Sequence, residues 1–202
     1  MKKLLIATRN VGKLKELSEF LSDLPLKIVS LSDLGIADEV EEDGKTYEEN
    51  AKKKAVFYAK KTGLPALSDD GGLEIAAFDN APGVRSRRWI GESATEEDLL
   101  RHMEKVAREL DDNNRQASFV NVIALALPSG KTWTTKGRID GIIAKEPFAE
   151  VSIGLPYRRC FYLPDLKKYY HEKSLSKAQM RRYNHRRKSV EAMKPVIKKV
   201  FF

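Results

Sequence analysis

Residues 64–72 of the sequence read LPALSDDGG: an apolar run leads into two adjacent carboxylates, and two glycines follow. A short apolar run bounded by turn residues is typical of a buried strand. We therefore expect a strand around Ala66, a loop over Leu67–Gly72 and another strand over Leu73–Ala77. Two like charges side by side are either solvated acids in an exposed turn or a place where a cation binds. The rest of the chain has to decide between these alternatives.

The composition is that of a globular chain. It has 202 residues, of which 42% are apolar and 33% charged, and this suits one domain over residues 1–202, in two lobes without a separate linker. The single cysteine, Cys160, excludes an internal disulfide framework and a four-cysteine metal site. The first apolar run, Leu4–Ala7, is too short for a secretion signal or a membrane span. We expect a cytoplasmic protein that does not associate with a membrane.

The net charge of +8 is concentrated at one end of the chain. Residues 158–202 contain 14 Lys and Arg against three Asp and Glu. Such a segment is either a solvated basic surface or a surface that binds a polyanion. The polyanion could be a nucleotide, a nucleic acid or an acidic partner. Charge alone favours the first alternative.

Hydrophobic periodicity predicts strands on both sides of the opening stretch. One of them is interrupted by a polar residue, Asn121. The expected strands are Lys3–Thr8, Lys27–Leu31, Ala117–Leu127, Lys131–Arg138 and Gly141–Ala144.

Helices are predicted by capping residues and by apolar spacing. Thr46 and Glu49 form a T-x-x-E capping box, which opens a helix that ends before Gly63. The other expected helices follow Asn10, span Ser93–Leu110 and carry Val190 to Ile197. Strands and helices alternate first and a run of strands follows, so the chain is predicted to be an α/β protein with a mixed sheet.

The first strand leads through a loop, Ala7–Lys13, into a helix N-terminus. Unpaired backbone N–H groups and a partial positive charge at such an end suit a phosphate. Thr8 and Asn10 can add hydrogen bonds, and Lys13 adds a positive charge. The spacing is not that of a Walker A loop, and an ordinary capped helix with a surface lysine is the alternative.

Many carboxylates accompany this phosphate-binding candidate, more than bare phosphates would tolerate. Mg²⁺ prefers oxygen ligands and is usually held by one or two carboxylates together with phosphates and water. A neighbouring carboxylate can take the proton of an attacking water. The acids are Glu39, Glu41, Glu42, Asp43, Asp69 and Asp70.

In combination, these motifs resemble the inosine triphosphate pyrophosphatase family, which acts on non-canonical purine nucleoside triphosphates. The family's T-x-N-x-G-K-x-x-E is matched by Thr8–Glu16, and its D-D-S-G-L-E-V by Asp69–Ile75 with Gly71 in place of Ser. Two longer motifs match over Glu42–Ala55 and Ala81–Gly91. Order and spacing agree across residues 1 to about 147.

The resemblance implies an elongated α/β fold with helices around a mixed sheet, two lobes about a nucleotide cleft, and a homodimer. It implies hydrolysis of a nucleoside triphosphate to the monophosphate and pyrophosphate with Mg²⁺, or Mn²⁺ as an alternative. By matched position, Asp70 would be the metal-linked general base, Asp69 its supporting acid, and Glu41 or Glu42 a further metal ligand. Residues implied to hold the phosphates or the substrate are Thr8, Asn10, Lys13, Lys54, Gly71, Arg88, Tyr157, Arg158, His185 and Arg186.

The C-terminal third departs from the family pattern. The base-recognition motif G-F-G-Y-D-P-x-F-x-x-P stands as Gly154–Pro164, with Leu155 for the stacking aromatic and Arg158-Arg159 for Asp-Pro. An arginine only donates hydrogen bonds, whereas a carboxylate accepts them. The resemblance and this departure together predict a changed base preference. The alternative is that Arg158 and Arg159 point to solvent and that the base pocket has decayed.

Two functions remain open on the sequence. The first is an active pyrophosphatase with altered base specificity, which the retained acids and Lys13 favour. The second is a catalytically retired relative that binds nucleotide, nucleic acid or a protein partner. The second function is favoured by the run Arg181–Lys188, in which an aromatic residue, Tyr183, stands among cations. Proteins that bind single-stranded nucleic acid combine cations and aromatic residues in this way.

Overall fold

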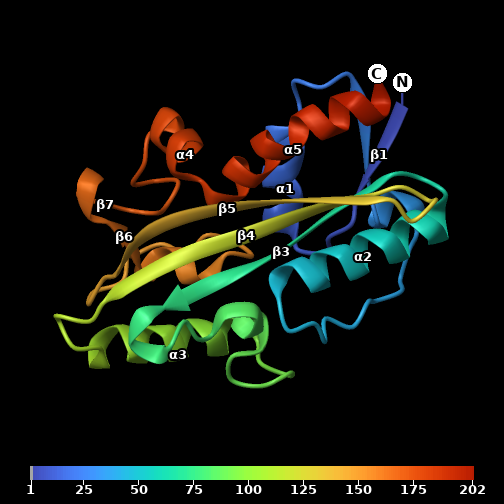
Figure 1. The fold of residues 1–202 in the computed structure, drawn as a ribbon. Coiled ribbons are helices and arrows are strands. Elements are labelled where there is room, and N and C mark those ends of the chain that lie inside the picture. Colours follow the sequence, from blue (N-terminus) through green and yellow to red (C-terminus); the bar gives the residue numbers. More distant parts are fainter. Residues whose placement is uncertain (1) are drawn as a thin grey trace. The chain divides into compact units, whose positions relative to one another are not determined.

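The structure, a computed structural model that describes residues 2–202, contains a mixed seven-stranded sheet with the strand order β2-β1-β3-β4-β5-β6-β7 (Figure 1). β1 pairs in parallel with β2 and β3, whereas β6 is antiparallel to both β5 and β7. The predicted α/β class with a mixed sheet is confirmed. The strands are β1 (Lys2–Ile6), β2 (Leu26–Ser30), β3 (Ala66–Ile75), β4 (Gln116–Ala126), β5 (Thr132–Ile143), β6 (Phe161–Leu163) and β7 (Lys168–Tyr169).

Five α-helices flank the strands, among the residues that are described. They are α1 (Val11–Phe20), α2 (Tyr47–Thr62), α3 (Glu96–Glu109), α4 (Lys177–Tyr183) and α5 (His185–Phe201). The chain forms two compact units. The first comprises the residues up to Asp70 with Asn121–Gly137 and His185–Phe202, and the second comprises Gly71–Val120 and Arg138–Asn184.

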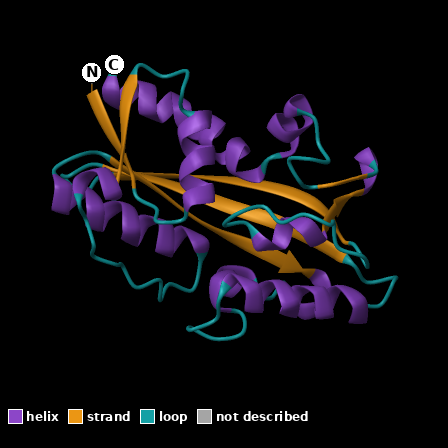
Figure 2. Cartoon of the chain, turned by 180° about the vertical axis from the view of Figure 1, so that it is seen from behind, coloured by secondary structure: helices purple, strands orange, loops and turns teal. Residues whose placement is uncertain are grey.

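In the first unit, β1 has apolar side chains on both faces because helices cover both. Leu4 and Ile6 pack with residues of α1 and α5, whereas Leu5 packs with residues of α2. Figure 1 accordingly shows α1 and α5 on one side of the strands and α2 on the other. Both views place the two chain ends side by side (Figure 2). The parallel strands of this unit, β1 with its neighbours β2 and β3, are therefore covered on both faces, as expected for such strands.

The predicted helix ends are found where the capping residues stand. Asn10 caps α1, and Thr46 with Glu49 forms the capping box of α2. α2 ends at Gly63, which adopts the left-handed conformation that favours glycine, with φ 66°. Local chemistry thus fixes the helix N-termini that face the candidate site.

In the second unit, one apolar core joins α3 to the strands. Leu99 and Met103 of α3 pack with Leu73 and Ile75 of β3, and Phe161 and Tyr170 belong to the same cluster. Cys160 is also part of this core and is fully buried.

The loop predicted at Leu67–Gly72 is wrong, because β3 runs without interruption from Ala66 to Ile75. Gly72 is required by a close approach and not by a turn. A Cβ on Gly72 would lie 2.2 Å from the Ser86 Oγ and 2.3 Å from the Gly83 carbonyl oxygen. The two carboxylates therefore stand within a strand, where the backbone fixes their directions.

The separate strands predicted at Lys131–Arg138 and Gly141–Ala144 are likewise a single strand, β5. Gly137 within it is again a point of contact, since a Cβ there would lie 2.1 Å from the His185 carbonyl oxygen and 2.7 Å from the Ser189 nitrogen. Gly137 thus lets the first turn of α5 lie directly against β5. The short elements α4, β6 and β7 carry too few residues to show a period and were not predicted.

Within residues 2–202, none of the helices combines the length and the apolar character that crossing a bilayer requires.

Candidate active site

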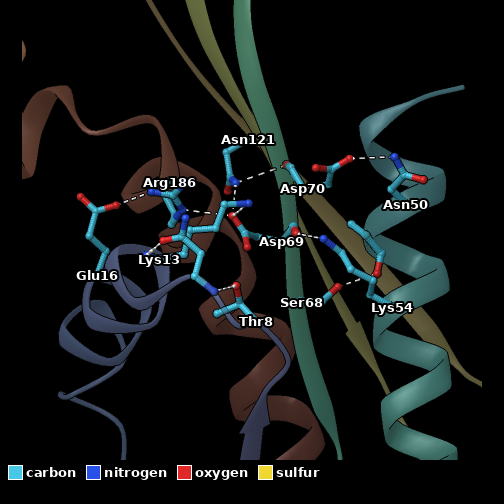
Figure 3. A network of polar contacts seen from close by, with 12 residues as sticks. Thr8, Lys13, Glu16, Asn50, Lys54, Ser68, Asp69, Asp70, Asn121 and Arg186 are labelled. Atoms are coloured by element: carbon cyan, nitrogen blue, oxygen red, sulfur yellow. Dashed lines mark hydrogen bonds and ion pairs between the residues drawn. The ribbon is translucent and has the colours of Figure 1, made fainter. Parts of the chain in front are cut away.

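The candidate site in the first unit starts at the N-terminus of α1. Asn10 accepts a hydrogen bond from the Lys13 backbone nitrogen at 2.9 Å, and the Asn10 nitrogen donates to the Thr8 Oγ1 at 3.3 Å. These contacts shape the turn, and the Lys13 side chain points from it toward the carboxylates, with Nζ 3.2 Å from the Asp69 Oδ2 (Figure 3). Of the predicted phosphate-binding residues, Lys13 therefore lies beside Asp69, on the turn that Thr8 and Asn10 shape.

Asp69 is buried, with 1% of its surface exposed, and one of its oxygens carries most of its contacts. The Oδ2 atom accepts from Arg186 Nε at 3.1 Å and from Asn121 Nδ2 at 2.8 Å, in addition to its ion pair with Lys13. Arg186 also pairs with Glu16 on α1. The other oxygen, Oδ1, is buried without a hydrogen-bond partner among residues 2–202.

The charges around Asp69 keep it ionised. Burial by itself would raise the pKa of this carboxyl, but Lys13, Arg186 and Lys54 overcome it and hold the pKa well below the usual range. Removing one partner of such a buried pair costs roughly 3–5 kcal/mol, because the remaining charge is left uncompensated. The carboxylate is therefore a fixed anion that anchors α1 and α5 to β3.

Asp70 points to the other side of β3, toward α2. Its Oδ2 accepts from the Asn50 Nδ2 at 3.0 Å (Figure 3). Lys54, one turn further along α2, donates to the Asp69 backbone oxygen at 2.7 Å and forms an ion pair with Glu42. Alternation along the strand explains why two adjacent acids have different partners.

The pKa of Asp70 is shifted in the opposite direction from that of Asp69. Burial raises it above the usual value, and the negative charge of Glu42 adds to this effect, while Lys54, Lys13 and the Asn50 hydrogen bond act against it. A carboxylate with a raised pKa is a stronger base. Lys54 remains a cation here, because Glu42 and the two aspartates offset its burial and raise its pKa.

The oxygen donors of this site fit a hard divalent cation whose coordination is completed by a bound ligand. No group of three or more His, Cys, Asp or Glu side chains suited to a metal occurs in the described part of the chain. Mg²⁺ does not require one, since one or two carboxylates with phosphates and water suffice. Asp70 and Glu42 are carboxylates whose charges act on one another, whereas Glu41 is exposed. Of the two glutamates left open by the sequence, Glu42 is the one whose charge acts on Asp70.

The remaining predicted residues lie partly outside this network. His185 is buried beside Arg186 at the start of α5. Gly71, Arg88, Tyr157 and Arg158 belong to the second unit. There Arg88 pairs with Glu92 at 3.3 Å, and the Tyr157 hydroxyl donates to the Ser86 carbonyl oxygen.

Arg158 is buried in the second unit, with 4% of its surface exposed. Its guanidinium carbon lies 4.6 Å from the ring centroid of Tyr170, and its charge lowers the pKa of the neighbouring His171, for which burial is the larger cause. Arg158, which stands where the family motif has an aspartate, is therefore not a solvated surface residue.

Four residues of the network were not among the predicted site residues: Glu16, Asn50, Asn121 and Ser189. Ser189 joins the network through its Oγ, which donates to the Asn121 Oδ1 at 2.6 Å. The first two stand inside the matched motifs Thr8–Glu16 and Glu42–Ala55. Asn121 gave a signal as the polar interruption of an apolar strand. Ser189 gave none, because a serine on a helix is ordinary.

Comparison with known proteins identifies the class to which this fold and site belong. A model of the Ham1 family matches residues 4–196, so the chain belongs to the Ham1 family. A dITP/XTP pyrophosphatase of Geobacter sulfurreducens is 48% identical over 151 residues, which are 73% of this chain and 74% of that protein. Another, of Desulfotalea psychrophila, is 40% identical over 95% of this chain and 83% of that protein.

The fold has solved counterparts as well. A HAM1 protein from Coxiella burnetii superimposes with a TM-score of 0.83 at 35% identity, covering 98% of this chain and all of that one. A nucleoside-triphosphatase described as a dITP/XTP pyrophosphatase, from Mycobacterium abscessus, has a TM-score of 0.72 at 33% identity over 95% of this chain and 98% of its own. These findings confirm the predicted family and the predicted class of enzyme, a hydrolase of acid anhydrides.

Proposed function

We propose that this chain hydrolyses a nucleoside triphosphate to the monophosphate and pyrophosphate. The observation that carries the proposal is the pair of adjacent carboxylates on β3 with opposite pKa shifts, next to a helix N-terminus with Lys13. The names of the relatives support it, since they act on dITP and XTP.

The triphosphate binds at the N-terminus of α1. The backbone N–H groups of its first turn and the charge of Lys13 suit phosphate oxygens. The network itself contains the cations Lys13, Lys54 and Arg186 against the carboxylates Glu16, Glu42, Asp69 and Asp70. A polyanion therefore needs a further cation in this site.

Mg²⁺ is the cation we propose, held by Asp70 and Glu42 together with substrate phosphates. When bound, it neutralises phosphate charge and lowers the pKa of water. Asp70 accepts the proton of the attacking water, as a carboxylate placed beside the metal can do. Asn50 orients this carboxylate, and Asp69 holds Lys13 and Arg186 in place.

The first test is pyrophosphate release with Mg²⁺ from a panel of ribo- and deoxynucleoside triphosphates, including inosine and xanthosine triphosphates. We expect turnover of at least one, and Asp70→Asn should abolish it while nucleotide binding persists. Full activity of Asp70→Asn would refute the assigned base. A protein that is inactive across the panel would refute the function.

We further propose that the base preference differs from that of relatives with an acidic residue at position 158. Arg158 can only donate hydrogen bonds, and loss of a matched polar contact to a base costs roughly 1–3 kcal/mol. Arg158→Asp should therefore shift the ratio of kcat/KM values toward inosine triphosphate. Arg159→Gln, which removes a neighbouring guanidinium that pairs with Glu104, serves as the matched control. An unchanged substrate profile in Arg158→Asp would show that this position does not select the base.

The second candidate function is nucleic-acid binding through the basic C-terminal segment. The observation that favours it is the positive charge of residues 158–202, which contain 14 Lys and Arg and three Asp and Glu. Binding of single-stranded RNA or DNA that weakens steeply with salt, together with no turnover on the panel, would establish it.

A further inference from the structure

Two polar side chains are buried where apolar ones would suffice. Asn121 lies in the middle of β4 and Ser189 lies on α5, and each has 0% of its surface exposed. Ten of the eleven positions of β4 are buried, so an apolar residue would fit the strand pattern at position 121. A buried amide or hydroxyl costs free energy unless it is hydrogen-bonded. Both residues meet this condition through each other and through the carboxylate pair.

The hydrogen bonds form a relay from α5 to β3. The Ser189 Oγ donates to the Asn121 Oδ1 at 2.6 Å, with the Arg186 carbonyl oxygen at 2.8 Å as its other acceptor. The Asn121 Nδ2 donates to the Asp69 Oδ2 at 2.8 Å and to the Asp70 backbone oxygen at 3.3 Å (Figure 3). Because the Asp69 Oδ2 and the Asp70 backbone oxygen can only accept hydrogen bonds, the NH₂ end of Asn121 faces them, and its Oδ1 end accepts from the Ser189 hydroxyl.

The relay differs from the other contacts of Asp69 in being neutral. Lys13 and Arg186 are cations, and a bound polyanion competes with Asp69 for them. An amide has no net charge, so a triphosphate does not draw Asn121 away from the carboxylate. Asn121 also holds the peptide that carries Asp70, which neither cation does among the contacts described.

We infer that Asn121 is a positioning residue for the hydrolytic step and that Ser189 orients its amide. The inference rests on the proposed function, since it assigns a role in that reaction. Asn121 acts on the geometry of Asp69 and Asp70 and not on the substrate. Its loss should therefore lower kcat and leave KM nearly unchanged.

The experiment is a double-mutant cycle on steady-state kinetics with the best triphosphate of the panel. Asn121→Leu keeps the number and branching of the side-chain heavy atoms and removes both ends of the amide, and Ser189→Ala removes the hydroxyl. We expect kcat to fall about 10-fold in Asn121→Leu and about 3-fold in Ser189→Ala, with KM within about 2-fold. The double variant should be no slower than Asn121→Leu, because Ser189 acts through Asn121.

Thr135→Val is the matched control. The Thr135 Oγ1 donates to the Ser189 backbone oxygen at 2.7 Å, so the substitution removes a hydroxyl contact to the same residue outside the relay. Its kcat should stay within about 2-fold of wild type. If Asn121→Leu does not fold, Ser189→Ala compared with the hydroxyl-retaining Ser189→Thr measures the same contact.

The outcomes separate this inference from the proposed function. Wild-type kcat in Asn121→Leu, a loss expressed mainly in KM, or independent and additive effects of the two substitutions would overturn the positioning role while the enzyme stays active. A wild-type protein that releases no pyrophosphate from any triphosphate would overturn the proposed function, and the positioning role with it.

Discussion

Asp69 and Asp70 are neighbours in sequence with opposite electrostatic surroundings. Asp69 faces Lys13 and Arg186 and has a lowered pKa, while Asp70 faces Asn50, with Glu42 adding to the effect of burial, and has a raised one. Pairs of carboxylates whose environments separate their pKa values are typical of sites that divide one reaction between two acids. Here the two aspartates have different surroundings because successive side chains of a strand point to opposite faces. Sequence analysis had predicted a loop at this place.

A prediction at the residue scale concerns the titration of Asp70. In the metal-free and nucleotide-free protein, its carboxyl should titrate above the usual Asp pKa, because burial and Glu42 raise it. Asn50→Leu removes a hydrogen bond that lowers this pKa and should move the titration to still higher pH. Carboxyl ¹³C shifts measured against pH give both values.

Lys53→Met is the control for that titration, since Lys53 lies on the same helix and pairs with Asp43 at 2.6 Å. A titration of Asp70 that is unchanged in Asn50→Leu would show that the Asn50 contact does not stabilise the ionised form.

At the scale of elements, three segments bring the site together: the N-terminus of α1, the first turns of α2 and the start of α5. The first two were predictable, because capping by Asn10 and by Thr46 with Glu49 is local chemistry written in adjacent residues. The contact of α5 with β5 was not, because it depends on Gly137, whose role appears only when two distant segments meet.

The prediction for these elements is a substitution at Gly137. A Cβ there would collide with backbone atoms of His185 and Ser189, so Gly137→Ala should displace the first turn of α5 and with it Arg186. We expect a loss of about 2 kcal/mol in unfolding free energy together with reduced kcat. Urea unfolding and steady-state kinetics measure the two effects.

Gly63→Ala provides the comparison for Gly137→Ala. Gly63 has a positive φ of 66° but open space where its Cβ would stand, so the cost should be about 1 kcal/mol from backbone strain alone. Its kcat should match wild type. Equal kinetic effects of the two substitutions would contradict a specific role of the contact between β5 and α5.

For the whole molecule, sequence reasoning predicted the class of fold and named most of the charged residues that the structure brings together around β3. It did so because the motifs keep the phosphate-binding turn and the acids at fixed spacings. It missed the continuity of β3 and β5, since glycines that permit close approach look like turn glycines in a sequence. It missed Ser189 because its importance lies in a partner 68 residues away. The single domain over residues 1–202, the homodimer and the cytoplasmic location stay predictions.

A prediction for the whole molecule is its response to acid. The folded-state pKa of Asp69 lies well below that of an ordinary aspartate. Ionisation of this group therefore stabilises the fold fully above the unfolded-state pKa of about 4, and the stabilisation is lost as the pH falls from there toward the folded-state pKa. The urea midpoint of the wild type should therefore drop between about pH 5 and pH 2.

Asp69→Asn should be less stable than wild type at neutral pH but lose less on acidification. A variant with the same steep acid dependence as wild type would show that other carboxyl groups control it.

The solitary thiol of this protein has a practical consequence. Cys160 sits within the core of the second unit, and burial raises its pKa to about 12. At neutral pH it is neither ionised nor accessible, so alkylating reagents have no target while the core is closed. Every labelling event then reports a transient opening of that core. The rate of alkylation of Cys160 therefore measures local unfolding of the second unit without an engineered cysteine.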